Sequence, residues 1–322
     1  MSLTQRKFSP NLINENKTIL RNDVDYKNTN SDIKKKSLTC NFDELPHWLQ
    51  DNVDILTCYR RPTYSYIKCF QSLFYIHNES VNIWSHLIGA LIFIIISITT
   101  YFFLSAYPTI TIWDFIVQYS FLAGVLMCLT FSTLFHSFMC HSEMVCANWN
   151  RCDYCGIVFL SIGSMIPIAY YVFYCNKTLR IIYIALVCIL GSATISVAIP
   201  IRFRTPEFRL FRTTLFIALG GSVFIPIIHA IVIYGLNICY NIIAFKWMLS
   251  TLLIYFVGAI IYGARVPEKL YPGSFDILGS SHQIFHMFVV LGCLCNYYGL
   301  ISAMSYWHKN NSDCQIDIEL LK

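Results

Sequence analysis

The chain is polar at its start and then alternates between long apolar stretches and short polar segments. Seven stretches without Asp, Glu, Lys or Arg follow one another, at residues 87–104, 115–135, 154–175, 181–199, 213–233, 247–264 and 284–306. Each lies near the ~20 residues with which an α-helix crosses a hydrocarbon layer of ~30 Å. Because lipid offers no partners to backbone N–H and C=O groups, the pattern predicts seven transmembrane α-helices. Pro167 and Pro226 lie inside the third and fifth stretches and predict kinks there.

The predicted fold class is an all-α integral membrane protein whose chain divides into four segments. Residues 1–41 are polar and rich in Asn and Lys, which is typical of a disordered tail. Residues 42–82 mix aromatic and charged side chains and predict short helices that lie along the membrane interface. We expect residues 83–307 to form the seven-helix transmembrane domain and residues 308–322 to form a second tail.

The composition supports this class and excludes a soluble protein. Of the 322 residues, 56% are hydrophobic and only 13% are charged, which leaves too few charged side chains to cover a soluble surface. The first residues contain no apolar run, so we expect no cleavable signal peptide. We also expect no nucleic-acid partner.

The distribution of Lys and Arg predicts the orientation of the chain in the membrane. The segments on the side of the N-terminus carry 18 of these residues, whereas the segments on the other side carry 5. Positively charged segments remain in the cytosol. The sequence therefore predicts a cytosolic N-terminus and a C-terminus on the outer or luminal side.

Fourteen cysteines raise the question of a disulfide framework. Most of them fall inside apolar stretches or on the predicted cytosolic side, where cysteines behave as small apolar residues. Cys152 and Cys155 have the CxxC spacing of a redox motif, but they lack a βαβ context and lie at a membrane boundary. We expect these two cysteines to serve packing.

Candidate chemistry gathers at the predicted cytosolic ends of three helices. His282 and His286 are one helical turn apart at the start of the seventh stretch, His136 follows the second stretch, and Asp153 precedes the third. Three histidines with an open fourth position are the ligand set of a catalytic Zn²⁺ site. The sequence predicts these histidines as ligands, Asp153 as the base that acts on water, and Ser132 as a group that orients the site or polarises a substrate carbonyl.

The other histidines differ from this set in their expected depth in the membrane. His86 begins the first stretch on the same side and remains an alternative ligand. His229 lies 16 residues into the fifth stretch, or about 24 Å along a helix axis, so we exclude it. His141 and Glu143 fall in the loop after the second stretch, and we expect them to be solvated.

The motifs resemble those of the progestin and adipoQ receptor family, which includes the adiponectin receptors and haemolysin III-like proteins. The matching motifs are Ser132-x3-His136, Asp153-Tyr-x-Gly156, Pro267-Glu and Gly-Ser-Ser-His-x3-His at residues 279–286. The resemblance covers residues 42 to about 307. One position departs from it, because Cys58 stands where the family commonly has Gly before Tyr-Arg.

The resemblance implies a seven-helix fold with a cytosolic N-terminus and a Zn²⁺ site at the three matching histidines. Adiponectin receptors of this family are associated with ceramide hydrolysis. A Golgi member, to which the chain is similar at residues 173–176, 266–269 and 278–284, is associated with tethering Raf kinase and damping Ras–Raf–MEK–ERK signalling. We therefore expect a location in the Golgi membrane, with the plasma membrane as the alternative.

Two functional classes follow from these observations. The first is a Golgi tether that sequesters Raf kinase through its cytosolic N-terminal region, above all residues 42–74. The expected anchors of the interface are aromatic and Arg residues such as Trp48, Tyr59, Arg60 and Arg61. The second is a zinc-dependent hydrolase of a membrane lipid amide such as ceramide, which the acid Asp153 beside an open metal position favours. A hormone receptor ranks third, because the outer loops are short.

Overall fold

A computed structural model describes residues 37–200, 206–310 and 314 of the chain. The chain divides into two compact units, Met1–Leu38 and Thr39–Lys322, and the elements described below belong to the second. Most of the predicted tail at residues 1–41 lies outside the described residues. The long helices are α3 (Ser80–Ser105), α4 (Ile112–Phe138), α5 (Glu143–Val172), α6 (Lys177–Ala198), α7 (Arg209–Gly221), α8 (Phe224–Tyr234), α10 (Phe245–Ala264) and α11 (Ser281–Asn310).

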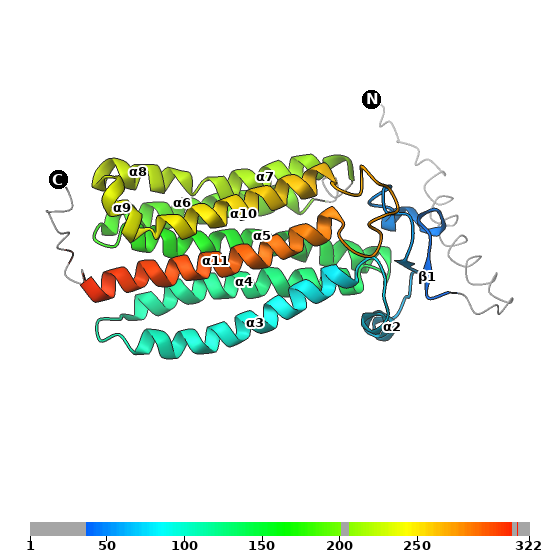
Figure 1. Ribbon diagram of the computed structural model, residues 1–322, viewed down its shortest axis with the longest axis horizontal. Helices are drawn as coiled ribbons and strands as arrows, with labels where there is room; N and C mark the ends of the chain where they lie inside the picture. Colours follow the sequence, from blue (N-terminus) through cyan, green and yellow to red (C-terminus); the bar gives the residue numbers. More distant parts are fainter. Residues whose placement is uncertain (1–36, 201–205, 311–313, 315–322) are drawn as a thin grey trace, which may run out of the picture. The chain divides into compact units, whose positions relative to one another are not determined.

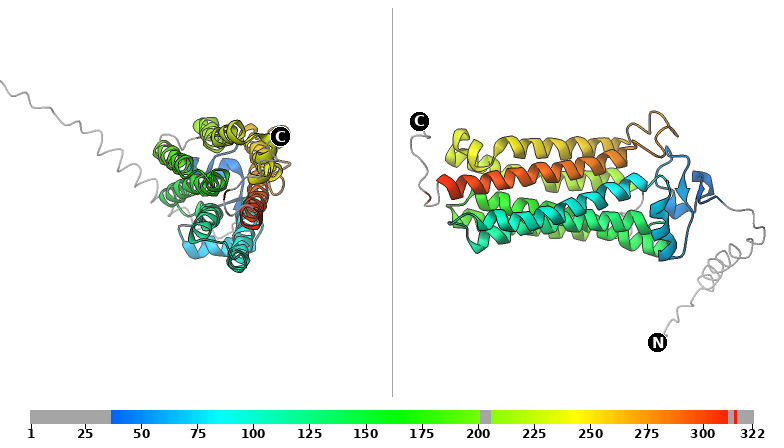
Figure 2. Two further views of the ribbon diagram at one scale, coloured as in Figure 1. Left: turned by 90° about the vertical axis from the view of Figure 1, so that its left-hand side faces the viewer. Right: turned by 60° about the horizontal axis from the view of Figure 1, so that its bottom comes forward.

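Seven spans among the described residues are long and apolar enough to cross a membrane, which confirms the predicted fold class. Their helices lie side by side and run between the same two ends of the bundle (Figure 1). Seen from one end, they surround the bundle axis (Figure 2). Contacts connect α3 to α4, α4 to α5, α5 to α6, α6 to α7, α7 to α10, α10 to α11, and α11 back to α3. This closed order brings the first and last spans together.

The fifth span is interrupted where proline predicted a kink. It consists of α7 and α8, which meet at Ser222 and Val223, and Pro226 lies in the first turn of α8. A proline has no N–H to continue the hydrogen bonding of a helix, so the chain is broken just before it. The third span differs, because α5 is one continuous helix through Pro167.

The third span also begins earlier than its sequence indicated. The apolar stretch starts at residue 154, whereas α5 starts at Glu143 with Ser142 as its N-cap residue. Glu143 and Asp153 therefore belong to the helix, and the prediction that Glu143 lies in a loop was wrong. His141 stays outside α5, but it packs against the ring of Tyr66 at a centroid distance of 4.4 Å. Polar residues can extend a membrane helix beyond the apolar stretch that crosses the lipid, so hydropathy does not show where the helix begins.

Glycines hold α4 and α5 in close contact. A Cβ atom on Gly124 would lie 2.6 Å from the carbonyl oxygen of Phe159, and one on Gly163 would lie 2.5 Å from that of Ser120. A Cβ atom on Gly156 would lie 2.9 Å from the Cα atom of Cys128. Small residues allow such an approach between membrane helices. The contact places the end of α4 beside α5, where His136 and Asp153 reside.

The segment before α3 closes one end of the bundle. It contains a two-stranded antiparallel sheet of β1 (Thr39–Cys40) and β2 (Tyr59–Arg60), the short helix α2 (Tyr66–Gln71) and three single 3₁₀ turns, so it is less helical than the sequence indicated. Short helices were predicted, but the sheet was not. The segment also binds the loop after α10. The Asp276 carboxylate of that loop accepts hydrogen bonds from the backbone N–H of Leu56 and from both the backbone N–H and the hydroxyl of Thr57.

Arg60 fixes this segment to the end of α4. Its guanidinium donates to the carbonyl oxygens of His136 and Ser137 and to the hydroxyl of Ser72, and the residue is only 3% exposed. Tyr59 is 9% exposed. Neither side chain is available to anchor a partner protein, so this part of the expected docking surface was wrong. Arg60 instead satisfies carbonyl groups that the helix end leaves without intrahelical partners.

The backbone at Cys58 shows why the family commonly has glycine at this position. Cys58 has φ = 64°, which lies in the left-handed region that glycine adopts without a steric penalty. A side chain in this region costs roughly 1–2 kcal/mol. The chain therefore keeps the turn that precedes β2 although it lacks the glycine.

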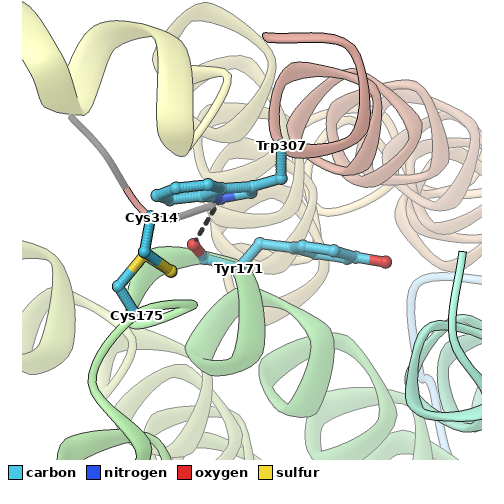
Figure 3. The surroundings of a disulfide bond; sticks show 4 residues. All are labelled: Tyr171, Cys175, Trp307 and Cys314. Carbon is cyan, nitrogen blue, oxygen red and sulfur yellow. Dashed lines mark hydrogen bonds between the residues drawn. A yellow bond between two sulfur atoms is a disulfide. The ribbon is translucent and has the colours of Figure 1, made fainter. Parts of the chain in front are cut away.

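The opposite end of the bundle is closed by a disulfide and by buried polar groups (Figure 3). Cys175 follows α5 and is bonded to Cys314, 139 positions further along the chain. The indole N–H of Trp307 donates to the carbonyl oxygen of Tyr171 at 2.9 Å. Cys152 and Cys155 are free, as expected. The view of cysteines as small apolar residues holds for these two, but it missed the disulfide.

Candidate metal centre

The three histidines predicted as metal ligands lie together at the end of the bundle that the N-terminal segment closes. His136 comes from the last turn of α4, and His282 and His286 come from the first two turns of α11. Their candidate ligand atoms all lie within 4.8 Å of one another, and the ring centroids are 4.8 to 5.0 Å apart. His136 and His286 are each 2% exposed. The closed order of the bundle brings α11 into contact with α4, and this contact brings the three side chains together.

The start of α11 is fixed by a carboxylate from the preceding loop. Glu268 is fully buried and accepts hydrogen bonds from the backbone N–H of Ser281, at 2.7 Å, and from the Ser281 hydroxyl. Gly279 turns the chain just before this point with φ = 87°. A negative group at a helix N-terminus satisfies free N–H groups and interacts favourably with the helix dipole. This cap sets the rotation of the turn that carries His282.

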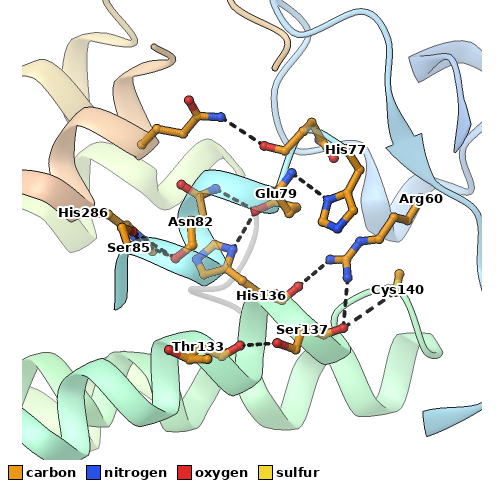
Figure 4. Close-up of polar contacts among 12 residues, drawn as sticks. Arg60, His77, Glu79, Asn82, Ser85, Thr133, His136, Ser137, Cys140 and His286 are labelled. Atoms are coloured by element: carbon orange, nitrogen blue, oxygen red, sulfur yellow. Dashed lines mark hydrogen bonds and ion pairs between the residues drawn. The ribbon is translucent and has the colours of Figure 1, made fainter. Parts of the chain in front are cut away.

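The first turn of α3 orients two of the three histidines (Figure 4). The Glu79 carboxylate lies 2.7 Å from Nδ1 of His136 and accepts a second hydrogen bond, also 2.7 Å, from the amide of Asn82. The carbonyl oxygen of Asn82 lies 3.0 Å from Nδ1 of His286, and the Ser85 hydroxyl lies 3.5 Å from the same nitrogen. One helical turn thus holds imidazoles from α4 and from α11.

These contacts fit a metal site because they fix which ring nitrogen carries the proton. A carbonyl oxygen can only accept, so Nδ1 of His286 carries the hydrogen and Nε2 keeps its lone pair. The Glu79 carboxylate has the same effect on His136, whose Nε2 atom is buried and has no partner among the described residues. Metal-binding histidines usually donate their second N–H to a carboxylate or a carbonyl in this way. The donor set and its orientation fit Zn²⁺.

Glu79 stays ionised and its neighbour His77 stays neutral across the neutral pH range. Burial by itself raises the pKa of Glu79, but the contact with His136 and the hydrogen bond from Asn82 outweigh it and lower this pKa below its usual range. Burial and the charge of Arg60 lower the pKa of His77 to about 3. His77 is therefore neutral, and its Nδ1 atom accepts the backbone N–H of Glu79 at 3.1 Å.

Asp153 and Ser132 lie beside the histidines, as the sequence predicted. Ser132 is one turn before His136 on α4 and is 2% exposed, and Asp153 lies on α5, which packs closely against α4. Both residues line the same cavity as the three histidines. The constellation therefore forms from α4, α5 and α11, the three helices that the sequence indicated.

The two competing histidines have different positions. The ring of His86 stacks on that of His286 with centroids 3.7 Å apart, and both of its nitrogens are buried without a partner among the described residues. It lies outside the group of three whose ligand atoms meet. His229, on α8, contacts the hydroxyl of Tyr183 through Nδ1 at 2.8 Å, next to Phe173. Its exclusion was correct.

A cavity of about 890 Å³ extends from the histidines into the membrane-spanning part of the bundle. Its walls are mainly apolar side chains of α5, α7, α10 and α11. At the histidine end it also meets Arg209 and Arg212 of α7, and Arg209 lies over the ring of Tyr262 at 4.0 Å. The shape and the chemistry suit an amphiphile whose polar group lies at the histidines and whose chain follows the cavity.

Sequence reasoning missed Glu79 and Asn82 as groups that orient the ligands. A signal was present, since Glu79 and Asn82 are polar, three residues apart and located directly before the first apolar stretch. Their partner His136 is 57 residues away from Glu79, so no local pattern connects them. The role of Glu268 as a cap was missed for the same reason.

The fold and the site define a class of seven-helix membrane protein with a buried three-histidine centre. The family model described as haemolysin-III related matches residues 74–297, so the chain belongs to this family, the family of progestin and adipoQ receptors that its motifs resemble. The Adiponectin receptor protein of Drosophila melanogaster is 38% identical over 280 residues, which are 87% of this chain and 62% of the fly protein. The ADIPOR-like receptor IZH2 of Saccharomyces cerevisiae is also 38% identical, over 83% of this chain and 84% of its own length. Heptahelical transmembrane protein 1 of Arabidopsis thaliana is 37% identical, over 79% of this chain and 77% of its own length. The chain thus spans less than two thirds of the fly relative.

Proposed function

We propose that the chain is a metal-dependent hydrolase that cleaves an amide bond of a membrane lipid of the ceramide type. The observation that carries this proposal is the position of the three histidines and Asp153 at the polar end of an apolar cavity. A purely structural metal site needs neither an acid beside it nor a cavity that leads into the membrane. The family resemblance supports the same substrate class.

The residues of the chain have separate roles in this reaction. His136, His282 and His286 would hold Zn²⁺, which would supply Lewis acidity and make water more acidic. Asp153 is placed to accept the proton of the attacking water and to deliver it to the leaving amine nitrogen. The Ser132 hydroxyl, which lines the same cavity, is placed to orient the site or to polarise the substrate carbonyl. The apolar walls bind the chain of the lipid and keep bulk water from the amide.

Two features of the chain indicate which end of the bundle faces the cytosol. The asymmetry of Lys and Arg predicts that the end with the histidines faces the cytosol. The disulfide between Cys175 and Cys314 lies at the other end, and disulfides form in oxidising compartments such as the secretory lumen or the cell exterior. We therefore infer a cytosol-facing site in a membrane of the secretory pathway, with the Golgi favoured by the resemblance.

Turnover of a ceramide by the purified chain tests the proposal. The parent, loaded with Zn²⁺, should release fatty acid, and Asp153→Asn should bind metal normally but lose about 10²- to 10⁴-fold in kcat, since an amide cannot take the proton. Asn150→Ala, one turn away at the cavity wall, serves as the control. Equal turnover by Asp153→Asn and the parent would remove Asp153 from the mechanism, and no turnover by the loaded parent would overturn the hydrolase.

A second candidate function, tethering of Raf kinase, is favoured by exposed aromatic residues in the N-terminal segment. Tyr66 is 47%, Phe70 50% and Phe74 84% exposed, and they project from α2 and the turn after it. Exposed aromatic side chains are typical anchors of protein interfaces. These residues replace Tyr59 and Arg60 as the docking candidates.

Recruitment of Raf to membranes that contain the chain tests the tether. Removal of residues 1–74 would also remove Arg60 and its hydrogen bonds to α4, so surface substitutions are the better experiment. The variant Phe70→Ser, Phe74→Ser should keep its metal and lose recruitment. Ile95→Ser, at a 62% exposed position of α3 outside the cavity lining, should not change recruitment. Recruitment that survives the double substitution would place the docking surface elsewhere, and a parent that recruits no Raf would end this candidate.

A further inference from the structure

Two polar groups lie deep in the cavity, far from the histidines. Asn296 of α11 is 5% exposed and lines the cavity, and its side-chain amide makes no hydrogen bond to any residue that the structure describes. Ser164 of α5 also lines the cavity, and its hydroxyl oxygen is buried without a partner among the described residues. Their neighbours along the wall, such as Met165, Ile168 and Met248, are apolar.

The two groups lie at the same depth. Asn296 is ten residues after His286, which is about 15 Å along a helix axis, and Ser164 is eleven residues after Asp153, or about 16 Å. Helices α5 and α11 both begin at the histidine end, so these distances run in the same direction (Figure 1). An amide and a hydroxyl therefore face one cavity some 15 Å beyond the site of chemistry.

Unpaired polar groups at membrane depth are unfavourable unless a ligand or a substrate satisfies them. A buried amide without partners costs free energy, and polar residues inside membrane spans are usually functional. The Asn296 amide can donate and accept, and so can the Ser164 hydroxyl. A neutral group that does both, namely a hydroxyl, is their natural partner. A charged group is excluded because no charged side chain of the described residues lines this depth to compensate it.

We propose that Asn296 and Ser164 form a subsite for a hydroxyl group on the chain of the lipid. This inference rests on the proposed function, because it takes the polar head of the ligand to lie at the histidines. An extended chain advances about 1.2 Å per bond, so 15 Å corresponds to roughly 12 bonds. The favoured ligand class is thus a long-chain lipid with a hydroxyl near the twelfth carbon of its acyl chain.

Binding of three fatty acids to the full chain in lipid nanodiscs tests the subsite without requiring turnover. Stearate, 12-hydroxystearate and 2-hydroxystearate compete with a fluorescent fatty acid, and the two hydroxylated probes differ only in where the hydroxyl lies. The parent should bind 12-hydroxystearate about tenfold more tightly than stearate, as one or two neutral hydrogen bonds allow. The 2-hydroxyl should give no such gain.

Substitutions assign the preference to the two residues. Asn296→Leu, which replaces the amide with an apolar group of the same branching, should abolish the preference, and Ser164→Ala should reduce it. Ser192→Ala is the matched control, since Ser192 is exposed on α6 and bonds to its own helix. If Asn296→Leu does not fold, Ser164→Ala alone still decides. A parent without preference, or a preference that survives Ser164→Ala and Asn296→Leu, would overturn the proposal and assign the polar pair to an ordered water.

Turnover of the matching amides separates this inference from the proposed function. A parent that binds 12-hydroxystearate preferentially but cleaves neither N-stearoyl nor N-(12-hydroxystearoyl) sphingosine would keep the subsite and overturn the hydrolase. A parent that cleaves both amides with equal kcat/KM would keep the hydrolase and overturn the subsite. Failure to bind any of the three fatty acids would overturn the subsite, whereas turnover of the amides decides the hydrolase.

Discussion

Each end of the bundle buries a histidine against a carboxylate, and the two pairs are satisfied differently. At one end, Nδ1 of His136 contacts Glu79 at 2.7 Å, and its Nε2 atom is left facing a cavity without a partner. At the other end, Nε2 of His308 contacts Asp114 at 3.0 Å, and its Nδ1 atom contacts the hydroxyl of Thr109 at 2.9 Å. The first histidine has a nitrogen left over for a ligand, whereas the second has none.

The surroundings of the pairs differ in the same sense. Asp114 also accepts from the hydroxyls of Tyr171, at 3.1 Å, and Thr111, at 2.6 Å, and a disulfide closes this end. Around His136, two further histidines and Asp153 line one cavity, and the candidate ligand atoms of the three histidines lie within 4.8 Å of one another. A fully satisfied polar cluster stabilises the fold, while a cluster with free lone pairs and a cavity indicates chemistry. The histidine–carboxylate contact alone does not distinguish the two.

The largest expected effect is on stability and concerns the pair of His308 and Asp114, whose polar atoms all have partners. Asp114→Ala leaves His308 and Tyr171 without their common acceptor, and the loss of one partner from a buried pair costs about 3–5 kcal/mol in the free energy of unfolding. The metal content of the folded fraction should not change, because the pair lies at the opposite end. Denaturant titration in micelles measures the first quantity, with Ser105→Ala at the exposed end of α3 as the control. Unchanged stability would show that the two ends do not differ as described.

A smaller effect, on metal affinity, is expected from the pair of Glu79 and His136, which faces the cavity. Glu79→Gln should weaken Zn²⁺ binding about 10- to 100-fold, since the amide no longer stabilises His136 with a negative charge, and outer groups of this kind have effects of that size. The free energy of unfolding of the metal-free chain should change much less. Competition with a chelator of known affinity measures the change. Gln71→Ala on α2, outside the cavity lining, is the control, and a Glu79→Gln variant that retains metal as firmly as the parent would contradict the role of Glu79.

The sequence predicted the helices well and the contacts between them only in part. Seven spans follow from length and the absence of charge, and His136, Asp153 and His282 could be placed at one depth from the direction of their helices. The start of α5 at Glu143 was missed because hydropathy marks the lipid layer and not the end of a helix. Contacts such as Glu79 to His136 depend on the closed order of the bundle, which no local pattern contains.

The disulfide and the cavity could not be predicted for the same physical reason. Cys175 and Cys314 are 139 positions apart, and their pairing requires that α5 and α11 end side by side. The cavity is a space between side chains of several helices and of the N-terminal segment, so its size depends on packing. The polar residues Ser164 and Asn296 are visible in the sequence, but only the packing shows that they share one cavity.

The smallest expected effect concerns the turn before β2. Cys58→Gly should stabilise the chain by about 1 kcal/mol, because glycine removes the steric cost of φ = 64°, although its greater freedom in the unfolded state offsets part of the gain. Metal content should stay the same. A shift of the unfolding midpoint in micelles measures the change, and Cys188→Gly, within the exposed face of α6, should instead destabilise. Destabilisation by Cys58→Gly would contradict the strain assigned to this turn.

The metal content of the purified full chain tests the central claim most directly. Elemental analysis should find about one zinc per chain in the parent and in His229→Ala, which changes a histidine of α8 whose ring bonds to Tyr183. The double variant His282→Ala, His286→Ala should fold and contain almost none, because a single remaining histidine binds weakly. A parent without stoichiometric metal, or a double variant that keeps it, would contradict the assignment of this end of the bundle as a metal centre.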